Sequence, residues 1–98
     1  MIFLIHAPDR ADGLPVRQAH FDAHRAYLAD VAALPVEILV SGPFLADDDK
    51  TSIGSIFIVE APDRAAAEAF HHNDPFYKAG LWPDSTVSVL LRRRGSWG

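Results

Sequence analysis

A five-residue repeat constrains the fold of this chain most strongly. The segment Ala-Pro-Asp-Arg-Ala occurs at 7–11 and again at 61–65, each time after a β-rich run and before a helical pattern. Because Pro followed by Asp is a common way to end a strand and begin a helix, both halves of the chain are expected to run strand, turn, helix. This expectation holds whether or not the two halves arose by duplication.

The hydrophobic pattern predicts the remaining elements. Four strands are expected, at 2–7, 36–42, 52–61 and 86–92. Two helices are expected, at about 16–34 and at 64–72, the first ended by Pro35 and the second capped by Asp63. The segments 11–15 and 43–52 are expected to be loops, and the segment 73–83 is expected to be irregular or to form a short turn of helix.

The order strand, helix, strand, strand, helix, strand predicts an α+β fold. It is typical of a ferredoxin-like βαββαβ sandwich with an antiparallel four-stranded sheet. The length of 98 residues is that of one small domain, so a single domain is expected over 1–98.

Two strands are apolar on both of their faces. "IFLI" at 2–5 and "SIFIVE" at 55–60 alternate too weakly for a strand that presents one side to water. Because two helices can cover only one face of a four-stranded sheet, the other face would expose a large apolar patch. The same face of a second copy would cover it, which predicts a symmetric homodimer.

Composition excludes several classes of function. A hydrophobic content of 49% with only 22% charged residues excludes a disordered chain, and a net charge of −4 argues against nucleic acid as a partner. No apolar segment approaches the ~20 residues that span a bilayer, so no membrane partner is expected. The absence of cysteine excludes thiol chemistry and fits a cytoplasmic protein.

The stretch "RQAHFDAHRAYL" at 17–28 holds two histidines four residues apart. At about 100° per residue, both His20 and His24 fall within the apolar stripe of the first helix, and Arg17 borders that stripe. Buried polar groups need hydrogen-bonding partners. Each ring is therefore expected to find a partner on another element.

Asp74 is a candidate partner for one of these rings. It precedes Pro75, so its backbone is expected to be extended, just beyond the negative end of the second helix, where a carboxylate has no capping use. His71 and His72, which close that helix, are interpreted as capping or surface residues. Because the two helices pack on one face of the sheet, Asp74 could reach a histidine of the first helix. Such a pair suits either proton transfer near neutral pH or a structural hydrogen bond.

Several short motifs together resemble one family. They are the first strand "IFLIHAPDR", Arg17, "AHRAYL" at 23–28, "SGPFLADDD" at 41–49, "GSIFIVEAPDRAAAEAF" at 54–70 and "NDPFYKAGLW" at 73–82. In this order they resemble the YciI-like (YCII-related) family of the dimeric α+β barrel superfamily. The family histidine then falls on His24 and the family aspartate on Asp74. The sequence departs from the family at His20, where no histidine is expected, and at Phe21 and Asp22, where Arg-Pro is frequent.

The resemblance implies a His–Asp dyad in a pocket and an enzymatic role. Relatives include a dehydrochlorinase of chlorinated muconolactones, and muconolactone isomerase shares the wider fold, which together suggest proton abstraction next to a carbonyl. We therefore expect a lyase or isomerase that acts on a small, anionic carbonyl compound and needs no cofactor. The catalytic residues would be His24 and Asp74.

The expected substrate-binding residues are Arg17, Ser41, Gly42 and His20. Arg17 would bind a carboxylate, although a surface salt bridge is an equal interpretation. Ser41 and Gly42 would line the pocket, or Gly42 would serve only the turn before Pro43.

Three alternatives remain open from the sequence. A non-catalytic ligand-binding or accessory dimer would use the His–Asp pair as a structural hydrogen bond. A metal site would join His20, His24 and Asp74, although the spacing is weakly specific and no metal is expected. A haem-degrading or other oxidative activity ranks lower, because no residue pattern indicates haem or flavin.

Overall fold

The strands form one antiparallel sheet in the order β2-β3-β1-β4. The computed structural model describes residues 1–97, and Gly98, which ends the expected domain 1–98, lies outside the described residues. The strands are β1 (Ile2–Pro8), β2 (Glu37–Leu45), β3 (Ser52–Glu60) and β4 (Thr86–Val89). The predicted ferredoxin-like βαββαβ sandwich is confirmed.

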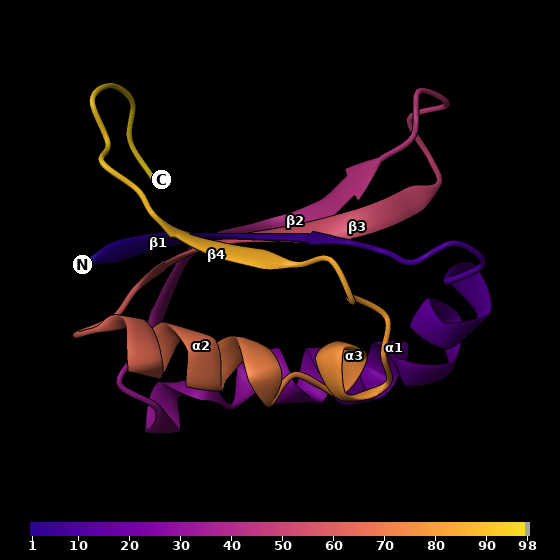
Figure 1. Cartoon of the computed structure of the whole chain (residues 1–98), viewed down its shortest axis with the longest axis horizontal. Coiled ribbons are helices and arrows are strands. Elements are labelled where there is room, and N and C mark those ends of the chain that lie inside the picture. Colours follow the sequence, from indigo (N-terminus) through magenta and orange to yellow (C-terminus); the bar gives the residue numbers. More distant parts are fainter. Residues whose placement is uncertain (98) are drawn as a thin grey trace.

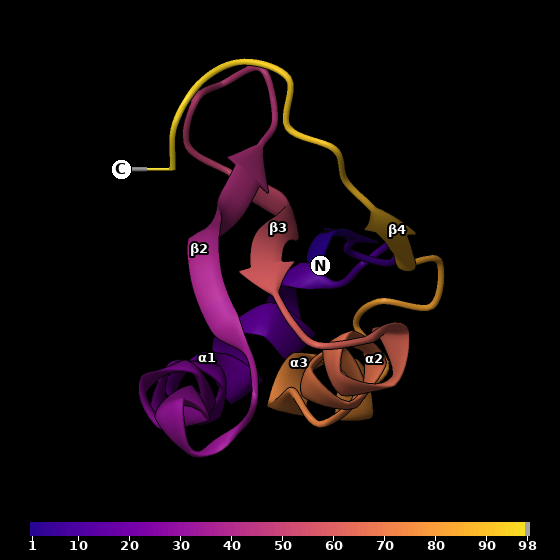
Figure 2. The same ribbon diagram turned by 90° about the vertical axis from the view of Figure 1, so that its left-hand side faces the viewer.

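The helices all lie on one face of this sheet (Figure 1). They are α1 (Leu14–Ala29), the 3₁₀ turn η1 (Val31–Ala33), α2 (Arg64–His72) and α3 (Pro75–Lys78). Figure 2 shows α1 below β2, with α2 and α3 beside it on the side of β4. Within residues 1–97 there is no helix with the length and apolar character needed to cross a membrane.

The first helix ends earlier than predicted. α1 ends at Ala29 rather than at 34, because the chain continues as η1 before Pro35. Within the segment 73–83, where irregular structure or a short turn of helix is predicted, residues 75–78 form the short helix α3. Pro75 suits the first turn of a helix, since its missing N–H would have no intrahelical partner there.

Two strand ends also differ from those predicted. β2 continues through Pro43 to Leu45. It lies at the edge of the sheet, and an edge strand tolerates proline because one of its sides has no hydrogen-bonding neighbour. β4 ends at Val89 rather than at 92, and Leu90 makes the last hydrogen bond to β1, at Ile2, where β1 begins.

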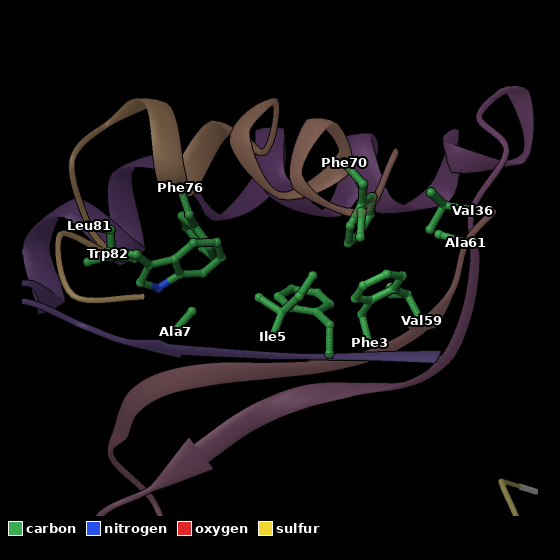
Figure 3. Packing of buried hydrophobic residues seen from close by; sticks show 12 residues of the cluster. Phe3, Ile5, Ala7, Val36, Val59, Ala61, Phe70, Phe76, Leu81 and Trp82 are labelled. Carbon is green, nitrogen blue, oxygen red and sulfur yellow. The ribbon is translucent and has the colours of Figure 1, made fainter. Parts of the chain in front are cut away.

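The hydrophobic core lies between the helices and the inner face of the sheet (Figure 3). Alternate residues of β1 and β3 are buried there, and aromatic rings from the helical layer pack against them. These residues are Phe3, Ile5, Ala7, Phe57 and Val59 from the sheet and Phe70, Phe76 and Trp82 from above it. On the outer face, Leu4, Ile56 and Ile58 are partly exposed, and no described helix covers them.

Candidate active site

His24 and Asp74 meet in the interior of the protein. The Nδ1 atom of His24, on α1, lies 2.9 Å from Oδ1 and 2.8 Å from Oδ2 of Asp74, which precedes α3. Both residues are buried, with exposed fractions of 8% and 1%. The sequence reasoning placed Asp74 within reach of the first helix, and the fold brings it to this histidine.

Asp74 also caps α3, which corrects one step of the sequence reasoning. Its Oδ1 accepts a hydrogen bond from the backbone N–H of Phe76 at 2.9 Å, as an N-cap residue does. The statement that Asp74 has no capping use is therefore wrong, because the four-residue helix α3 begins directly after it. The cap holds the carboxylate in place toward His24.

Aromatic rings fix the orientation of the His24 imidazole. The ring of Phe76 stacks on it with a centroid distance of 4.1 Å and an interplanar angle of 19°. Phe57 and Trp82 present edges to it, each with a centroid distance of 6.2 Å. With one face covered and one nitrogen held, the imidazole has little freedom to turn.

The contact with Asp74 sets which nitrogen of His24 carries the proton. A carboxylate accepts hydrogen bonds, so Nδ1 of the neutral ring is the donor and Nε2 keeps the lone pair. His24 lines a pocket, and among the described residues its ring hydrogen-bonds through Nδ1 alone. The free nitrogen is therefore available to a molecule bound there.

The pocket lies between α1 and the β2–β3 hairpin and has a volume of about 530 Å³. Its size suits a small molecule. Arg17, His24, Ser41 and Gly42, all named from the sequence, line it together with Phe21, Leu28, Lys50, Ser55 and Phe57. Gly42 lies within β2 rather than in a turn. A Cβ atom at this position would meet no atom within 4 Å, so the glycine leaves open space beside the pocket wall.

Arg17 is neither a surface residue nor a free cation. It is 7% exposed, and its Nε and Nη2 donate to Oδ2 and Oδ1 of Asp9 at 2.7 and 2.8 Å. Nη2 also donates to Oγ of Ser55 at 2.9 Å. Trp82 donates its indole N–H to Asp9 Oδ1 at 3.0 Å. The surface salt bridge considered from the sequence is therefore wrong, and the charge of Arg17 is balanced by a buried carboxylate.

Lys50 is the other cationic residue that lines the pocket. In the part of the chain that the structure describes, it takes part in no ion pair. Its backbone is held in the β2–β3 hairpin, where Asp48 Oδ1 accepts from the N–H groups of Lys50 and Thr51 at 2.9 Å each. Since Arg17 is paired with Asp9, Lys50 supplies the unbalanced positive charge at the pocket.

His20 does not lie where the helical pattern placed it. The side chain is exposed, and His20 is not among the residues that line the pocket. Phe76 packs on His24, and Phe70 packs on Tyr27 one turn later, but neither α2 nor α3 contributes an aromatic partner to His20. Within residues 1–97, no group of three His, Asp, Glu or Cys residues is placed to hold a metal ion, so the His20–His24–Asp74 site is not formed.

The sequence matches the YCII-related domain over residues 1–90. The chain belongs to the YCII-related family. A solved structure of 5-chloro-2-hydroxyhydroquinone dehydrochlorinase (TftG) from Burkholderia phenoliruptrix AC1100, in complex with 2,5-dihydroxybenzoquinone, superposes with a TM-score of 0.80. The two sequences are 40% identical over 93% of this chain and 94% of that chain. This likeness confirms the fold expected for a dimeric α+β barrel protomer.

A more distant structure shares the fold alone. At3g17210 from Arabidopsis thaliana superposes on this YCII-related chain with a TM-score of 0.51 and 13% identity, over 97% of each chain. No curated protein matches the chain.

Sequence reasoning about this YCII-related protein missed Ser55, which lines the pocket, and Asp9, which binds the pocket residue Arg17. Asp9 lies in the repeated pentapeptide, but it binds Arg17 and Trp82 and does not cap α1. Ser55 is a polar residue at an inward position of the apolar strand β3. A serine at an inward position of an apolar strand indicates a polar partner nearby, because a buried hydroxyl needs a hydrogen-bonding partner.

His71 is buried rather than exposed at the end of α2, so its interpretation as a capping or surface residue is wrong. Its ring stacks on Trp82, and its Nε2 lies 2.7 Å from Oγ of Ser85. Burial, and to a lesser degree the neighbouring His72, lowers the pKa of His71 to about 4, against a smaller opposite effect of Asp74. His71 is therefore neutral at physiological pH and cannot act as a cationic cap.

Proposed function

We propose that this protein is a lyase-type enzyme that uses His24 and Asp74 to move a proton next to a carbonyl of a small ring compound. The observation that carries the proposal is the divided role of the imidazole. Its Nδ1 is held by a buried carboxylate, and its Nε2 is left free at a pocket of about 530 Å³. A neutral histidine in this state is a competent general base.

The dehydrochlorinase named above supports a halogenated hydroquinone as the substrate class. In our proposal, His24 Nε2 removes the proton of a ring hydroxyl, and the released electron pair enters the ring. The resulting imidazolium returns that proton to the carbon that bears the chlorine, which leaves a carbonyl beside it. A second hydroxyl then loses its proton to solvent, and chloride leaves with its bonding electrons. The net change is the loss of one proton and one chloride ion, with no external oxidant.

Asp74 stabilises the imidazolium that forms during this transfer. A buried, paired carboxylate favours the protonated ring without itself taking the proton. The neighbouring Tyr27 is not a competing acid, because burial, and to a lesser extent the Asp74 charge, raises its pKa to about 12.

The pocket lining supports an anionic, planar ligand. Phe21, Leu28 and Phe57 offer apolar surface for a ring, and Lys50 offers a positive charge that no described residue neutralises. The guanidinium of Arg17 also lines the pocket, but its positive charge is already balanced by the carboxylate of Asp9. We therefore assign charge recognition to Lys50, and we leave the exposed His20 out of the proposed site.

The proposal is tested with 5-chloro-2-hydroxyhydroquinone under anaerobic conditions, by measuring chloride release. We expect turnover by the unaltered protein and its loss in His24→Gln. His20→Gln is the matched control on the same helix and should retain activity. Binding of 2,5-dihydroxybenzoquinone without any chloride release would instead favour a non-catalytic ligand-binding protein.

We also propose that two copies of the chain form a homodimer through the outer face of the sheet. That face carries Leu4, Ile56 and Ile58 on neighbouring strands, and the helices lie on the opposite side (Figure 1). The exposed Val40 lies beside Ile58 on β2 and extends this apolar surface. A two-fold symmetric contact would cover the same surface on both copies.

A further inference from the structure

Two segments project from the outer side of the sheet, at opposite ends of it (Figure 1). One is the turn between β2 and β3, residues 46–51, and the other is the tail that follows β4, residues 90–97. The helices lie on the other side of the sheet (Figure 1). The turn and the tail therefore extend toward whatever covers the outer face.

The turn and the tail carry opposite charges. The turn holds three consecutive aspartates at 47–49, and the tail holds three consecutive arginines at 92–94. All six residues are exposed, and within residues 1–97 none of them takes part in an ion pair. Arginine suits a contact with aspartate, because its planar guanidinium can donate two parallel hydrogen bonds to one carboxylate. Each segment therefore offers charge that the other would balance.

Both segments have a defined shape within the single chain. Asp48 accepts hydrogen bonds from two backbone N–H groups of the turn, each at 2.9 Å, and so closes it. In the tail, the guanidinium of Arg92 lies 5.3 Å from the centroid of the Trp97 ring, and Gly95 between them has a φ of +93°. Leu91, which precedes the arginines, is 69% exposed. Preformed segments lose less conformational entropy on binding than flexible ones do.

The homodimer proposed above can join these segments. Two sheets that stack face to face are related by a two-fold axis between them. An axis along the strands would place tail against tail and turn against turn, so that like charges meet. An axis across the strands exchanges the two ends of the sheet, so the tail of each copy meets the turn of the other. Opposite charges favour this second arrangement, and the symmetry forms the contact twice.

We propose that the arginines at 92–94 of each copy bind the aspartates at 47–49 of the other copy. This inference rests on the proposed homodimer and names the segments that set its orientation. It also reaches the pocket, because Lys50, Thr51 and Ser52, which line the pocket, directly follow the aspartates. The tail of each copy thereby holds in place the segment that carries Lys50 in the other.

The test reverses the charge of each segment in a separate variant. The tail variant combines Arg93→Glu with Arg94→Glu. The turn variant combines Asp47→Lys with Asp49→Asn, because Asp49 has a φ of +62°, which asparagine tolerates. Asp48 is left unchanged, since it closes the turn. All of the altered residues are exposed, so both variants should fold.

Sedimentation at a series of concentrations measures the Kd of the dimer. In each variant alone, like charges face each other in both contacts, so the Kd should rise about tenfold or more. In an equimolar mixture, the altered tail meets the altered turn and the unaltered tail meets the unaltered turn. Both contacts of a heterodimer then join opposite charges, and its Kd should lie within about threefold of the unaltered value. Native mass spectrometry identifies the heterodimer by its mass.

The control variant combines Arg25→Glu with Lys78→Glu, at exposed positions of α1 and α3. It changes the net charge as much as the tail variant does, but on the helical side of the sheet. Its Kd should stay within about twofold of the unaltered value. Added salt should raise the Kd of the unaltered dimer and lower that of the tail and turn variants, because it screens attraction in the one and repulsion in the others.

The outcomes separate this inference from the proposed homodimer. A monomeric unaltered protein would overturn the homodimer, and the contact between tail and turn with it. A dimeric unaltered protein whose Kd is the same in both variants would overturn the contact alone. Weaker dimers in both variants without recovery in the mixture would also overturn the contact, because the two segments would then not bind each other.

Discussion

The carboxylate of Asp74 accepts hydrogen bonds from two groups at once, the ring of His24 and the backbone N–H of Phe76. One side chain thereby begins the helix α3 and orients the imidazole at the pocket. The position of the proposed base therefore depends on the same side chain that caps α3.

Asp74→Asn should separate these two roles. The amide oxygen can still accept from Phe76, but the amide nitrogen is then turned toward His24 as a donor. His24 Nδ1 would have to become the acceptor, which places the proton on Nε2 and removes the base from the pocket. We expect kcat to fall by about 10²–10⁴-fold with little loss of stability. Nitrogen-15 NMR of the imidazole reports the tautomer, and an unchanged tautomer with full activity would contradict the assignment.

The two copies of the repeated pentapeptide provide a matched pair of variants. Asp63 caps α2 by accepting from the N–H of Ala66, while Asp9 binds the buried Arg17. Asp63→Ala should therefore lower the free energy of unfolding by about 1 kcal/mol. Asp9→Ala leaves a buried guanidinium without its partner and should lower it by about 3 kcal/mol or more. Urea unfolding measures the free energy of unfolding of both variants. Equal losses would mean that the Asp9–Arg17 ion pair stabilises the fold no more than the cap at Asp63 does.

The sequence predicts the order of the elements and the meeting of Asp74 with the first helix, because both depend on local patterns. The βαββαβ order follows from apolar periodicity and from two strand-ending pentapeptides. Asp74 stood out because a carboxylate at the end of α2 had no local explanation. Its second role as a cap escaped notice because α3 has only four residues, too few for a periodic pattern.

The remaining parts of the site depend on tertiary contacts that no local pattern encodes. A helical wheel gives the direction of His20 but does not say that no aromatic ring of α2 or α3 packs against that turn. Asp9 shares its pentapeptide with Asp63, so the local sequence does not show that Asp9 binds a buried arginine while Asp63 caps a helix. The network of Asp9, Arg17 and Ser55 joins three separate segments, and it is visible only once the sheet has formed.

Stability should fall as the pH is lowered through the range in which His71 titrates. The pKa of His71 in the folded protein is about 4, below the ordinary value of 6.5. Between these pH values His71 is protonated in the unfolded chain but neutral in the folded protein. The contribution of neutral His71 to the free energy of unfolding is therefore full above pH about 6.5 and is lost by pH about 4. The loss should be about 2 kcal/mol, after allowance for solvent screening.

His71→Gln removes this titration and should flatten the pH dependence of the unfolding free energy in that range. His20→Gln, at an exposed position, should leave the slope unchanged. Urea unfolding at a series of pH values measures the slopes. If His71→Gln and the unaltered protein lose stability in parallel below pH 6.5, His71 is not the responsible group.

The proposed homodimer should dissociate when a charge is placed on the outer face of the sheet. Ile58→Lys would bury an unpaired ammonium at the centre of that contact, which is strongly unfavourable. Ala65→Lys, on the exposed side of α2, is the control. Sedimentation at micromolar concentration should give twice the chain mass for the unaltered protein and the control, and the chain mass for Ile58→Lys. A monomeric unaltered protein would contradict the proposal.

Lys50 should set the preference of the pocket for anions. Lys50→Gln removes a charge that no described side chain balances, so the affinity for 2,5-dihydroxybenzoquinone, which is ionised at neutral pH, should fall by about five- to tenfold. The affinity for uncharged hydroquinone should stay within about twofold, because its binding gains little from the ammonium. Lys78→Gln, on α3, is the matched control, and calorimetry at two salt concentrations measures all three proteins.

Added salt should weaken binding of the anion to the unaltered protein and have less effect on Lys50→Gln. Equal losses for the charged and the uncharged ligand would show that Lys50 shapes the pocket and does not recognise charge.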